Sequence, residues 1–331
     1  NLNKILCTFC AILMVLTAFC VTASASSAYQ TYVYDVYGEA LYSPDAYTAI
    51  SAVDPKAMGL DVSLENPGDM VTDPDQNVYI ADTGNNRIVV LDRYYKVNFT
   101  ISEFSNDQGV PDRLTAPQGV FVSEPNEKYG KLIWVCDTGS NRIVVFDEFG
   151  NFQRIVEEPE SSLFDQDSVY KPVAIAVDAY NRLYVVSSTT YQGVIVMTDE
   201  GEFTGFIGAN KVSYNIVEYV WKNYFMTKAQ REQQASFVPT EYHNIYMDPA
   251  SFIYATNTIF SEYDLLWDVA QPIRRLNGIG NDILIKNDRY PPIGDLYWVE
   301  GTVEQGPSKF VDITVLENDI YVALDRTRGR L

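Results

Sequence analysis

One pattern recurs along this chain and constrains its fold more than any other feature of the sequence. The segment from Asn66 to Asp92 reads NPGDMVTDPDQNVYIADTGNNRIVVLD. A similar segment, APQGVFVSEPNEKYGKLIWVCDTGSNRIVVFD, follows from Ala116 to Asp147. Weaker copies begin at Lys171, Val238 and Phe310. A repeat of this size cannot bury its apolar faces alone, so the copies must stack on one another.

Each copy has the same internal order of short apolar runs and polar turns. The runs have the length of β-strands, and the Gly, Pro, Asn and Asp residues between them indicate an all-β repeat rather than alternating strands and helices. The aromatic content of 13%, with 24 Tyr and 16 Phe, also favours pleated sheet. Four-stranded units of roughly 40–50 residues are typical of propeller blades. The sequence therefore predicts an all-β propeller.

The stretches YIADTGNNRIVVLD and WVCDTGSNRIVVFD resemble the NHL repeat, and the resemblance extends over residues 64–331. It implies an NHL-type β-propeller, and the chain ends at Leu331 inside a repeat. We therefore expect a six-bladed parent that is truncated at its C-terminus. More narrowly, SPDAYTA, FVPTEYHNIYMD and LDRTRGR resemble secreted NHL-repeat proteins of the Firmicutes type.

The N-terminus predicts the compartment. An apolar run from Ile5 to Val21 follows Lys4 and precedes Ala23-Ser24-Ala25, a pattern typical of a secretory signal at residues 1–25. The alternative is an uncleaved membrane anchor, for which the run is near the lower length limit. We expect a secreted protein, or one on the extracellular face of the membrane. Membrane association would come only through this segment or a missing C-terminal region.

Residues 26–63 are expected to contain closing strands and a linker. The stretch from Tyr29 to Ser43 resembles the end of a blade. Leading strands of this kind can complete the last blade of a propeller and remove its free sheet edges. We therefore expect residues 29–43 to pair with late strands.

Charge and residue usage exclude several classes of function. There are 44 acidic and 24 basic residues, and the formal net charge of −20 repels nucleic acids. The single histidine, His243, excludes metal sites with several His ligands. The sequence also has no serine nucleophile elbow and no Gly-rich phosphate loop. Outside the signal segment only Cys136 remains, so we expect no intrachain disulfide.

A charge pair recurs at one turn of the repeat. The pairs are Asp82 with Arg87, Asp137 with Arg142, and Asp325 with Arg330. In the first two copies the turn contains Gly84 or Gly139, which we expect at positive φ. Because the pair repeats from blade to blade, it favours a structural role, and a partly exposed pair contributes about 0.2–1 kcal/mol.

The candidate site comes from a position at which the copies differ, at the start of the innermost strand. In chain order it is occupied by Asp69, Gly119, Ala174, Asn244 and Asp312. Inner strands begin at the mouth of the central channel, so the three polar members, with Glu241 beside them, predict an acidic ligand-binding rim. The two small members would form its open side. Such oxygen groups could hold Ca²⁺, the one candidate cofactor, or could simply cap strand ends and bind water.

Two segments depart from the blade pattern. Residues 216–234 contain no Gly or Pro and carry a helical apolar stripe, so we expect one inserted helix there. It would either cover a seam of the propeller or act as a lid or docking element. In the connection from Asp264 to Pro307, the adjacent Arg274 and Arg275 are candidates to meet the acidic rim or an anionic ligand.

Three functions remain open. The sequence favours a non-catalytic secreted or cell-surface scaffold that binds a protein or a glycan, because it lacks a nucleophile–base set. The alternative is a metal-dependent, lactonase-like hydrolase or lyase at the channel mouth. The third is a structural or sensor domain whose activity lies in a missing C-terminal region. A fold of this kind does not decide among them.

Overall fold

The computed structural model describes residues 32–35, 40–44, 47, 50–125, 130–161, 169–190, 192–208, 242–266, 270–284, 293–295, 298–300, 303–316 and 320–331. Its contacts divide the chain into two units, residues 1–52 and 53–331. In the first unit, β1 (Tyr32–Tyr34) pairs with β2 (Ala40–Tyr42) in an antiparallel hairpin. The expected pairing of residues 29–43 with late strands stays a prediction, and the signal segment lies outside the described residues.

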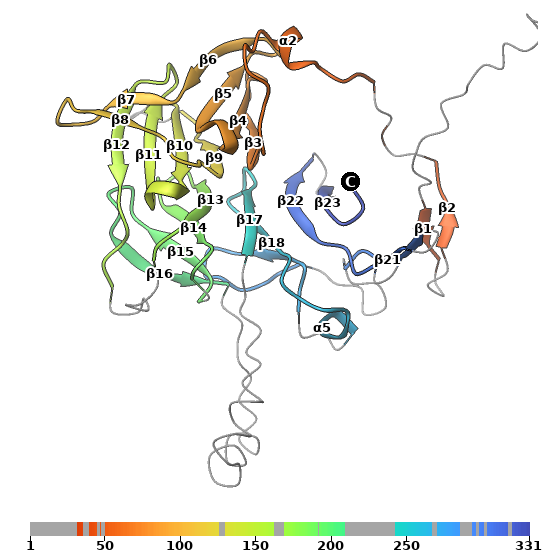
Figure 1. Ribbon diagram of the computed structural model, residues 1–331. Coiled ribbons are helices and arrows are strands. Elements are labelled where there is room, and N and C mark those ends of the chain that lie inside the picture. Colours follow the sequence, from red (N-terminus) through yellow and green to blue (C-terminus); the bar gives the residue numbers. More distant parts are fainter. Residues whose placement is uncertain are drawn as a thin grey trace, which may run out of the picture. The chain divides into compact units, whose positions relative to one another are not determined.

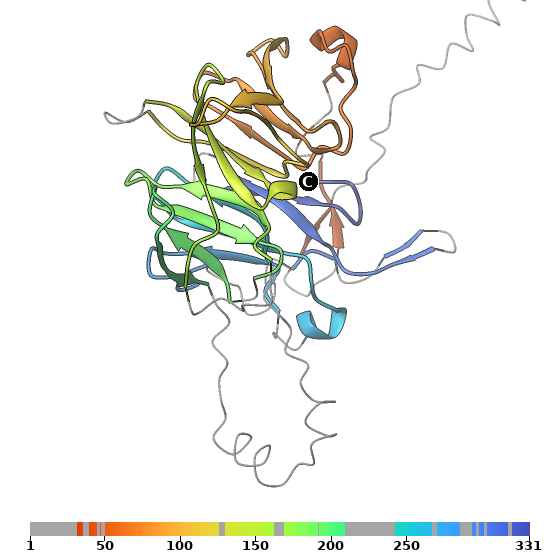
Figure 2. The ribbon, with the colours of Figure 1, turned by 60° about the vertical axis from the view of Figure 1, so that its left-hand side comes forward.

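The second unit consists of antiparallel sheets that follow one another along the chain (Figure 1). Blade 1 contains β3 (Asp69–Thr72), β4 (Val78–Asp82), β5 (Arg87–Leu91) and β6 (Val97–Ile101). Blade 2 contains β9 (Gly119–Val122), β10 (Leu132–Asp137), β11 (Arg142–Asp147) and β12 (Phe152–Val156). Blade 3 contains β13 (Pro172–Val177), β14 (Leu183–Ser187), β15 (Val194–Met197) and β16 (Phe203–Ile207). Figure 2 shows the strands of these blades side by side.

The later blades have fewer strands in the described part of the chain. Blade 4 contains β17 (Tyr242–Met247), β18 (Ile253–Asn257) and β19 (Ile273–Leu276), and the last sheet contains β22 (Phe310–Val315) and β23 (Tyr321–Asp325). Two hairpins lie outside the blades: β7 (Glu103–Ser105) with β8 (Pro111–Arg113), and β20 (Trp298–Glu300) with β21 (Val303–Gln305). The described helices are short: α2 (Pro55–Met58), α5 (Glu262–Leu266) and the 3₁₀ turns η1 (Thr83–Asn85) and η2 (Thr138–Ser140).

The predicted all-β propeller is thus confirmed, with four blades and little helix. The expected helix at residues 216–234 lies outside the described residues, and the six-bladed parent stays a prediction. Within the described residues no helix is long and apolar enough to span a membrane.

Alternating side chains explain why the blades stack. Along β10, Trp134 and Cys136 are fully buried in a cluster shared with blade 3. Their neighbours Ile133 and Val135 point to the other face and are buried in a cluster shared with blade 1. Successive residues of a strand point to opposite faces, so one strand supplies two cores. Each blade therefore depends on both of its neighbours.

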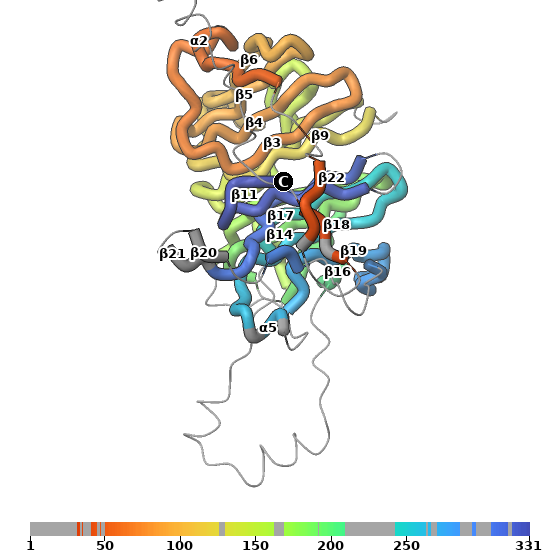
Figure 3. The backbone as a smooth tube through the Cα atoms, turned by 90° about the vertical axis from the view of Figure 1, so that its right-hand side faces the viewer, coloured from red at the N-terminus to blue at the C-terminus, as the bar shows by residue number. Residues whose placement is uncertain are grey.

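The innermost strands lie next to one another in chain order. β3 contacts β9, β9 contacts β13, β13 contacts β17, and β17 contacts β22. Figure 3 shows β22 beside β17 and β18. This order brings the starting residues of distant repeats to the same end of the channel.

The repeated aspartates tie the end of the second strand to the chain that enters the blade. In blade 1, the fully buried Asp82 accepts hydrogen bonds from the backbone N–H of Glu65 at 2.7 Å and from Arg87 Nε at 2.7 Å. In blade 2, Asp137 accepts them from the Thr115 N–H at 2.6 Å and from Arg142 Nε at 2.9 Å. The carboxylate therefore satisfies a backbone donor as well as an arginine.

The glycines of this turn have a different role from the expected one. Gly84 and Gly139 lie inside the 3₁₀ turns, and the left-handed residues are Asn86 (φ 54°) and Asn141 (φ 59°). At Gly139 an added Cβ would lie 2.5 Å from the carbonyl oxygen of Thr115. The expectation of positive φ at these glycines was wrong. Glycine is needed there because the entering chain passes too close for any side chain.

Threonine in the same turn joins neighbouring blades. The hydroxyl of Thr83 donates to the carbonyl of Pro117 at 2.6 Å, and that of Thr138 donates to the carbonyl of Pro172 at 2.6 Å. Each proline belongs to the next blade or its entry. In the Asp-Thr-Gly stretch, the aspartate therefore binds the chain that enters its own blade, and the threonine binds the following blade.

The third expected charge pair is not formed as predicted. The carboxylate of Asp325 is paired with Arg328 at 3.3 Å, and Arg330 is paired with Asp295. Asp325 and Arg330 still face each other as a backbone bridge. Arg330 is paired with Asp295 instead, an acid from a separate segment. The repeat pattern compares only neighbouring residues, so it does not predict this partner.

Candidate functional site

Three of the four predicted rim residues occupy the same place in their blades. Asp69, Asn244 and Asp312 each lie near the start of an inner strand and pair with the residue before the end of the second strand. These partners are Ala81, Thr256 and Leu324, respectively. The fourth predicted residue, Glu241, lies outside the described residues.

The three side chains meet through the amide of Asn244. Its nitrogen Nδ2 donates to Asp312 Oδ1 at 2.9 Å and lies 3.4 Å from Asp69 Oδ1. The amide oxygen accepts the backbone N–H of Ile245 at 2.7 Å, so the nitrogen faces the two carboxylates. A neutral donor thus lies between two acids from the first blade and the last sheet.

Backbone donors hold the two carboxylates in place. Asp69 accepts the N–H of Met70 at 2.9 Å through Oδ1 and the N–H of Val120, from the neighbouring blade, at 3.0 Å through Oδ2. Asp312 accepts the N–H of Ile313 at 2.8 Å. These bonds fix the direction of each carboxylate and favour its ionised form.

Burial opposes that ionisation. It raises the pKa of Asp69 above its usual value, against the hydrogen bonds from Val120, Met70 and Asn244. Burial, together with the charge of Asp69, raises the pKa of Asp312 to about 6. The two acids are therefore electrostatically coupled, and a group that offers hydrogen-bond donors or positive charge would be favourable beside them.

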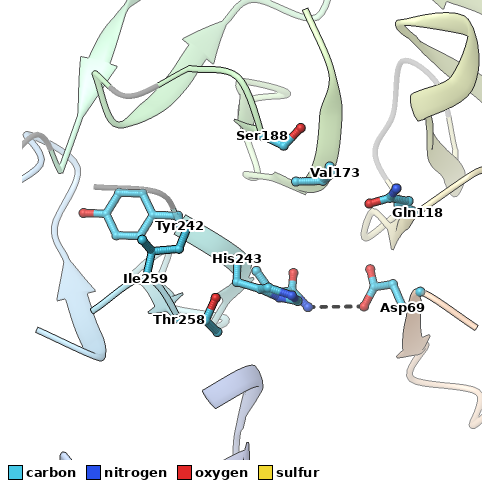
Figure 4. A pocket seen from close by; sticks show the side chains of 10 residues that line it. Asp69, Gln118, Val173, Ser188, Tyr242, His243, Thr258 and Ile259 are labelled. Carbon is cyan, nitrogen blue, oxygen red and sulfur yellow. Dashed lines mark hydrogen bonds between the residues drawn. The ribbon is translucent and has the colours of Figure 1, made fainter. Parts of the chain in front are cut away.

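A cavity of about 220 Å³ lies beside this group (Figure 4). Its lining residues are Gly68, Asp69, Gln118, Val173, Ser188, Tyr242, His243, Asn244, Thr258 and Ile259. They come from the starts of inner strands and from the connections that follow the second strands of blades 3 and 4. The cavity therefore lies at the end of the blades at which the inner strands start, which we call the channel mouth.

The predicted open side of the rim is wrong. Gly119 and Ala174 are buried, and a Cβ at Gly119 would lie 2.5 Å from the carbonyl oxygen of Val173. The inner strands of blades 2 and 3 approach too closely at this level to leave an opening. The residues immediately before them, Gln118 and Val173, line the cavity instead.

His243 also lines the cavity. Its Nδ1 lies 3.0 Å from the carbonyl oxygen of Val311, which can only accept, so Nδ1 carries the proton in that bond. Desolvation lowers the pKa of His243 below its usual value, which favours the neutral ring. In this tautomer the other nitrogen, Nε2, is a hydrogen-bond acceptor.

The two candidate arginines have other partners. Arg274 NH1 donates to the carbonyl of Gly208 at 3.2 Å and lies 3.4 Å from the hydroxyl of Tyr242. Arg275 is paired with Asp248 at 3.6 Å. Arg274 therefore supports the cavity from behind Tyr242, and Arg275 belongs to the turn of its own blade.

The described donor set does not suit a metal ion. Among the described residues there is no group of three or more His, Cys, Asp or Glu side chains that could hold one. Asn244 presents nitrogen rather than oxygen to the space between the acids, whereas Ca²⁺ is bound by six to eight oxygens. A Ca²⁺ site would need Asn244 to rotate and further oxygen ligands to join.

Sequence reasoning missed most of the cavity wall. Four of the lining residues lie at the same position of the repeat, directly before the position chosen for the rim. They are Gly68, Gln118, Val173 and His243. An alignment shifted by one residue would have found them. Ser188, Thr258 and Ile259 lie in connections that differ between the copies, so no repeat signal points to them.

Comparisons with known proteins support the repeat. The family model of the NHL repeat matches residues 64–91. A comparison with curated proteins found no match. Among solved structures, virginiamycin B lyase from Staphylococcus aureus is similar at 13% identity and a TM-score of 0.36 over 75% of this chain. This chain spans 59% of the length of that lyase.

Two further structures show the range of proteins that are similar at this level. One is a protein of unknown function from Bacteroides caccae, with 8% identity and a TM-score of 0.42 over 78% of this chain and 70% of that one. The other is a gluconolactonase from Xanthomonas campestris, with 16% identity and a TM-score of 0.35 over 68% of this chain and 61% of that one. The repeat matched in blade 1 and the observed blades together support an NHL-repeat β-propeller.

Proposed function

We propose that this chain is a non-catalytic binding propeller, secreted or held at the extracellular face of the membrane, whose channel mouth receives a polar group of a protein or glycan partner. The observation that carries the proposal is the cavity lined by Asp69 and Asn244, whose amide joins the carboxylates of Asp69 and Asp312. The signal-like N-terminus supports export, and the repeat resemblance supports a six-bladed parent.

The cavity size favours part of a large partner over a free small ligand. At about 220 Å³ it is below the roughly 300–1,000 Å³ of typical small-molecule pockets. It suits one side chain or one sugar ring that remains attached to a larger molecule. The net charge of −20 disfavours anionic partners, including nucleic acids.

The lining favours a ligand that donates hydrogen bonds. The ionised carboxylate of Asp69 can only accept, and Nε2 of His243 is also an acceptor in the tautomer that its bond to Val311 requires. Hydroxyl and amine groups meet this requirement. Tyr242, Val173 and Ile259 add an apolar wall against which the body of the group can pack.

The same geometry gives little support to nucleophilic catalysis. A serine or threonine nucleophile needs a base within hydrogen-bond reach. Within the described part of the chain, no hydrogen bond joins His243 to the hydroxyl of Ser188 or Thr258. We therefore place binding before hydrolysis at this site.

The test is a screen of the full chain against glycan and peptide arrays, followed by calorimetry with the best ligand. The Asp69→Asn, Asp312→Asn double variant should lose at least tenfold in affinity. The control Asp107→Asn removes an exposed carboxylate elsewhere and should bind like wild type. A Ca²⁺ titration separates the alternative: heat that disappears in the double variant, together with lactone turnover, would replace binding with metal-dependent hydrolysis.

A further inference from the structure

A second cavity, of about 240 Å³, lies at the other end of the strands from the channel mouth. β3 starts at the mouth with Asp69, so the turn that follows it lies at the far end. β5 and β11 also start at the mouth end, because Arg87 and Arg142 pair with the last residues of the preceding strands. We call this end the turn face; its turns include residues 73–77, 92–96, 147–151 and 178–182.

The second cavity lies between blades 1 and 2, and its wall is held by a cation that is mostly shielded from solvent. Lys131 Nζ lies 3.0 Å from Asp73 Oδ2 and 2.8 Å from Asp75 Oδ2, and the lysine side chain is only 9% exposed. Asp73 also accepts the hydroxyl of Tyr79 at 3.1 Å. The lysine from blade 2 is thus fixed to blade 1, and the cavity wall is organised before any ligand arrives.

Polar groups with unused hydrogen-bonding capacity line the second cavity. Asn98 and Glu148 are exposed and line the cavity, and neither side chain has a hydrogen-bond partner among the described residues. Asp75 is 73% exposed and keeps an oxygen that the contact with Lys131 does not use. Amides and carboxylates in this arrangement can accept and donate several hydrogen bonds to one ligand.

An exposed aromatic ring also lines the second cavity. Phe149 lines the cavity and is 72% exposed. Its turn is held by Asp147, which accepts the N–H of Phe149 at 3.0 Å and that of Asn151 at 2.8 Å. The ring is therefore presented to solvent by a hydrogen-bonded turn, and it is not part of the hydrophobic clusters of blades 1 and 2.

This face carries exposed aromatic rings. Among the described residues after Val53, the exposed Tyr and Phe side chains are Tyr94, Tyr95, Phe149 and Tyr180. All of them lie in turns of the turn face, and they come from blades 1, 2 and 3. Exposed rings on one face, one of them beside a cavity with exposed polar groups, favour an interaction surface there.

We propose that the turn face is a second binding site and that its ligand is a neutral oligosaccharide. One sugar unit would stack its C–H face on Phe149, and its hydroxyls would bond Glu148, Asn98 and Asp75. Neighbouring units would extend toward the other exposed rings. A neutral chain fits because the net charge of −20 repels anionic glycans, and because Lys131, the cation in the cavity, is already paired.

The proposal concerns a different surface from the channel mouth, and the experiment separates the two. The full chain is titrated with chitotetraose and cellotetraose, two neutral tetrasaccharides, and binding is followed by calorimetry. Phe149→Ala and Glu148→Gln should each weaken binding at least tenfold with an unchanged melting temperature. Val110→Ala, which removes an exposed apolar side chain from the β7–β8 hairpin, should leave it unchanged. The Asp69→Asn, Asp312→Asn double variant should also bind like wild type.

Three results would overturn the proposal. The first is a lack of binding to either tetrasaccharide at millimolar concentration. The second is binding that Phe149→Ala and Glu148→Gln leave intact. The third is binding that only the double variant at the channel mouth removes, because that result would place the glycan at the mouth instead.

Discussion

The side-chain amide of Asn244 donates a hydrogen bond to Asp312 at 2.9 Å, across 68 residues of sequence. The same nitrogen lies 3.4 Å from Asp69, which is 175 residues away. Two carboxylates from the first blade and the last sheet can therefore lie close together with a neutral donor between them. This arrangement makes Asn244 the central residue of the candidate site.

Replacement of Asn244 should change the titration of its neighbour. The amide hydrogen bond lowers the pKa of Asp312, whose value of about 6 is set mainly by burial and by the charge of Asp69. In Asn244→Ala the pKa of Asp312 should therefore rise further. Carboxyl-carbon NMR titration measures it, with Asn98→Ala as a control at an exposed amide. An unchanged pKa in Asn244→Ala would show that the amide does not act on Asp312.

Asp312 should also make the stability of the protein depend on pH. Its folded pKa of about 6 lies above the unfolded value of about 3.9, so the folded state binds the proton more tightly. The free energy of unfolding should rise as the pH falls through 6. The uncharged variant Asp312→Asn should exceed wild type at pH 7.5 by an amount on the order of 2 kcal/mol. Urea denaturation from pH 7.5 to 4.5 should show this gap closing; a constant gap would contradict the assignment.

The repeated aspartates should matter more than an exposed charge pair would. Asp82 and Asp137 are fully buried and each accepts a backbone N–H, so removal leaves a donor unsatisfied. Arg142 keeps a second acid, Asp112, at 2.8 Å, whereas among the described residues Arg87 keeps only the carbonyl of Val62. We expect Asp137→Ala to cost about 2 kcal/mol and Asp82→Ala about 3 kcal/mol, measured by urea denaturation. If both variants lose less than about 1 kcal/mol in the free energy of unfolding, the pairs contribute no more than the partly exposed charge pair expected from the sequence.

Gly139 should tolerate no side chain. A Cβ there would lie 2.5 Å from the carbonyl oxygen of Thr115, so Gly139→Ala must displace the chain that enters blade 2. We expect a loss of about 1–3 kcal/mol in the free energy of unfolding. Gly278→Ala is the matched control, because no atom lies within 4 Å of its added Cβ. Equal melting temperatures for the two variants would rule out the close approach at Gly139.

The sequence alone determined the blades. Strand alternation and the order of turns depend on neighbouring residues, and Ile133, Trp134 and Val135 show the alternation directly, because each points to the face opposite its neighbour. The rim position could also be predicted, since the copies align and a difference such as Asn244 against Ala174 is visible in the letters. These features depend on neighbouring residues or on the period of the repeat, so they can be predicted from the sequence alone.

Only the tertiary structure decided which groups meet. The bond between Asn244 and Asp312 depends on the stacking of blades and on the side-chain conformations at one end of the channel. The pairing of Arg330 with Asp295 depends on a separate segment that passes beside the turn. The cavity wall at Val173 depends on how closely two inner strands approach. Contacts between distant residues arise from packing over the whole unit, so a repeat pattern predicts where they can form but not which atoms form them.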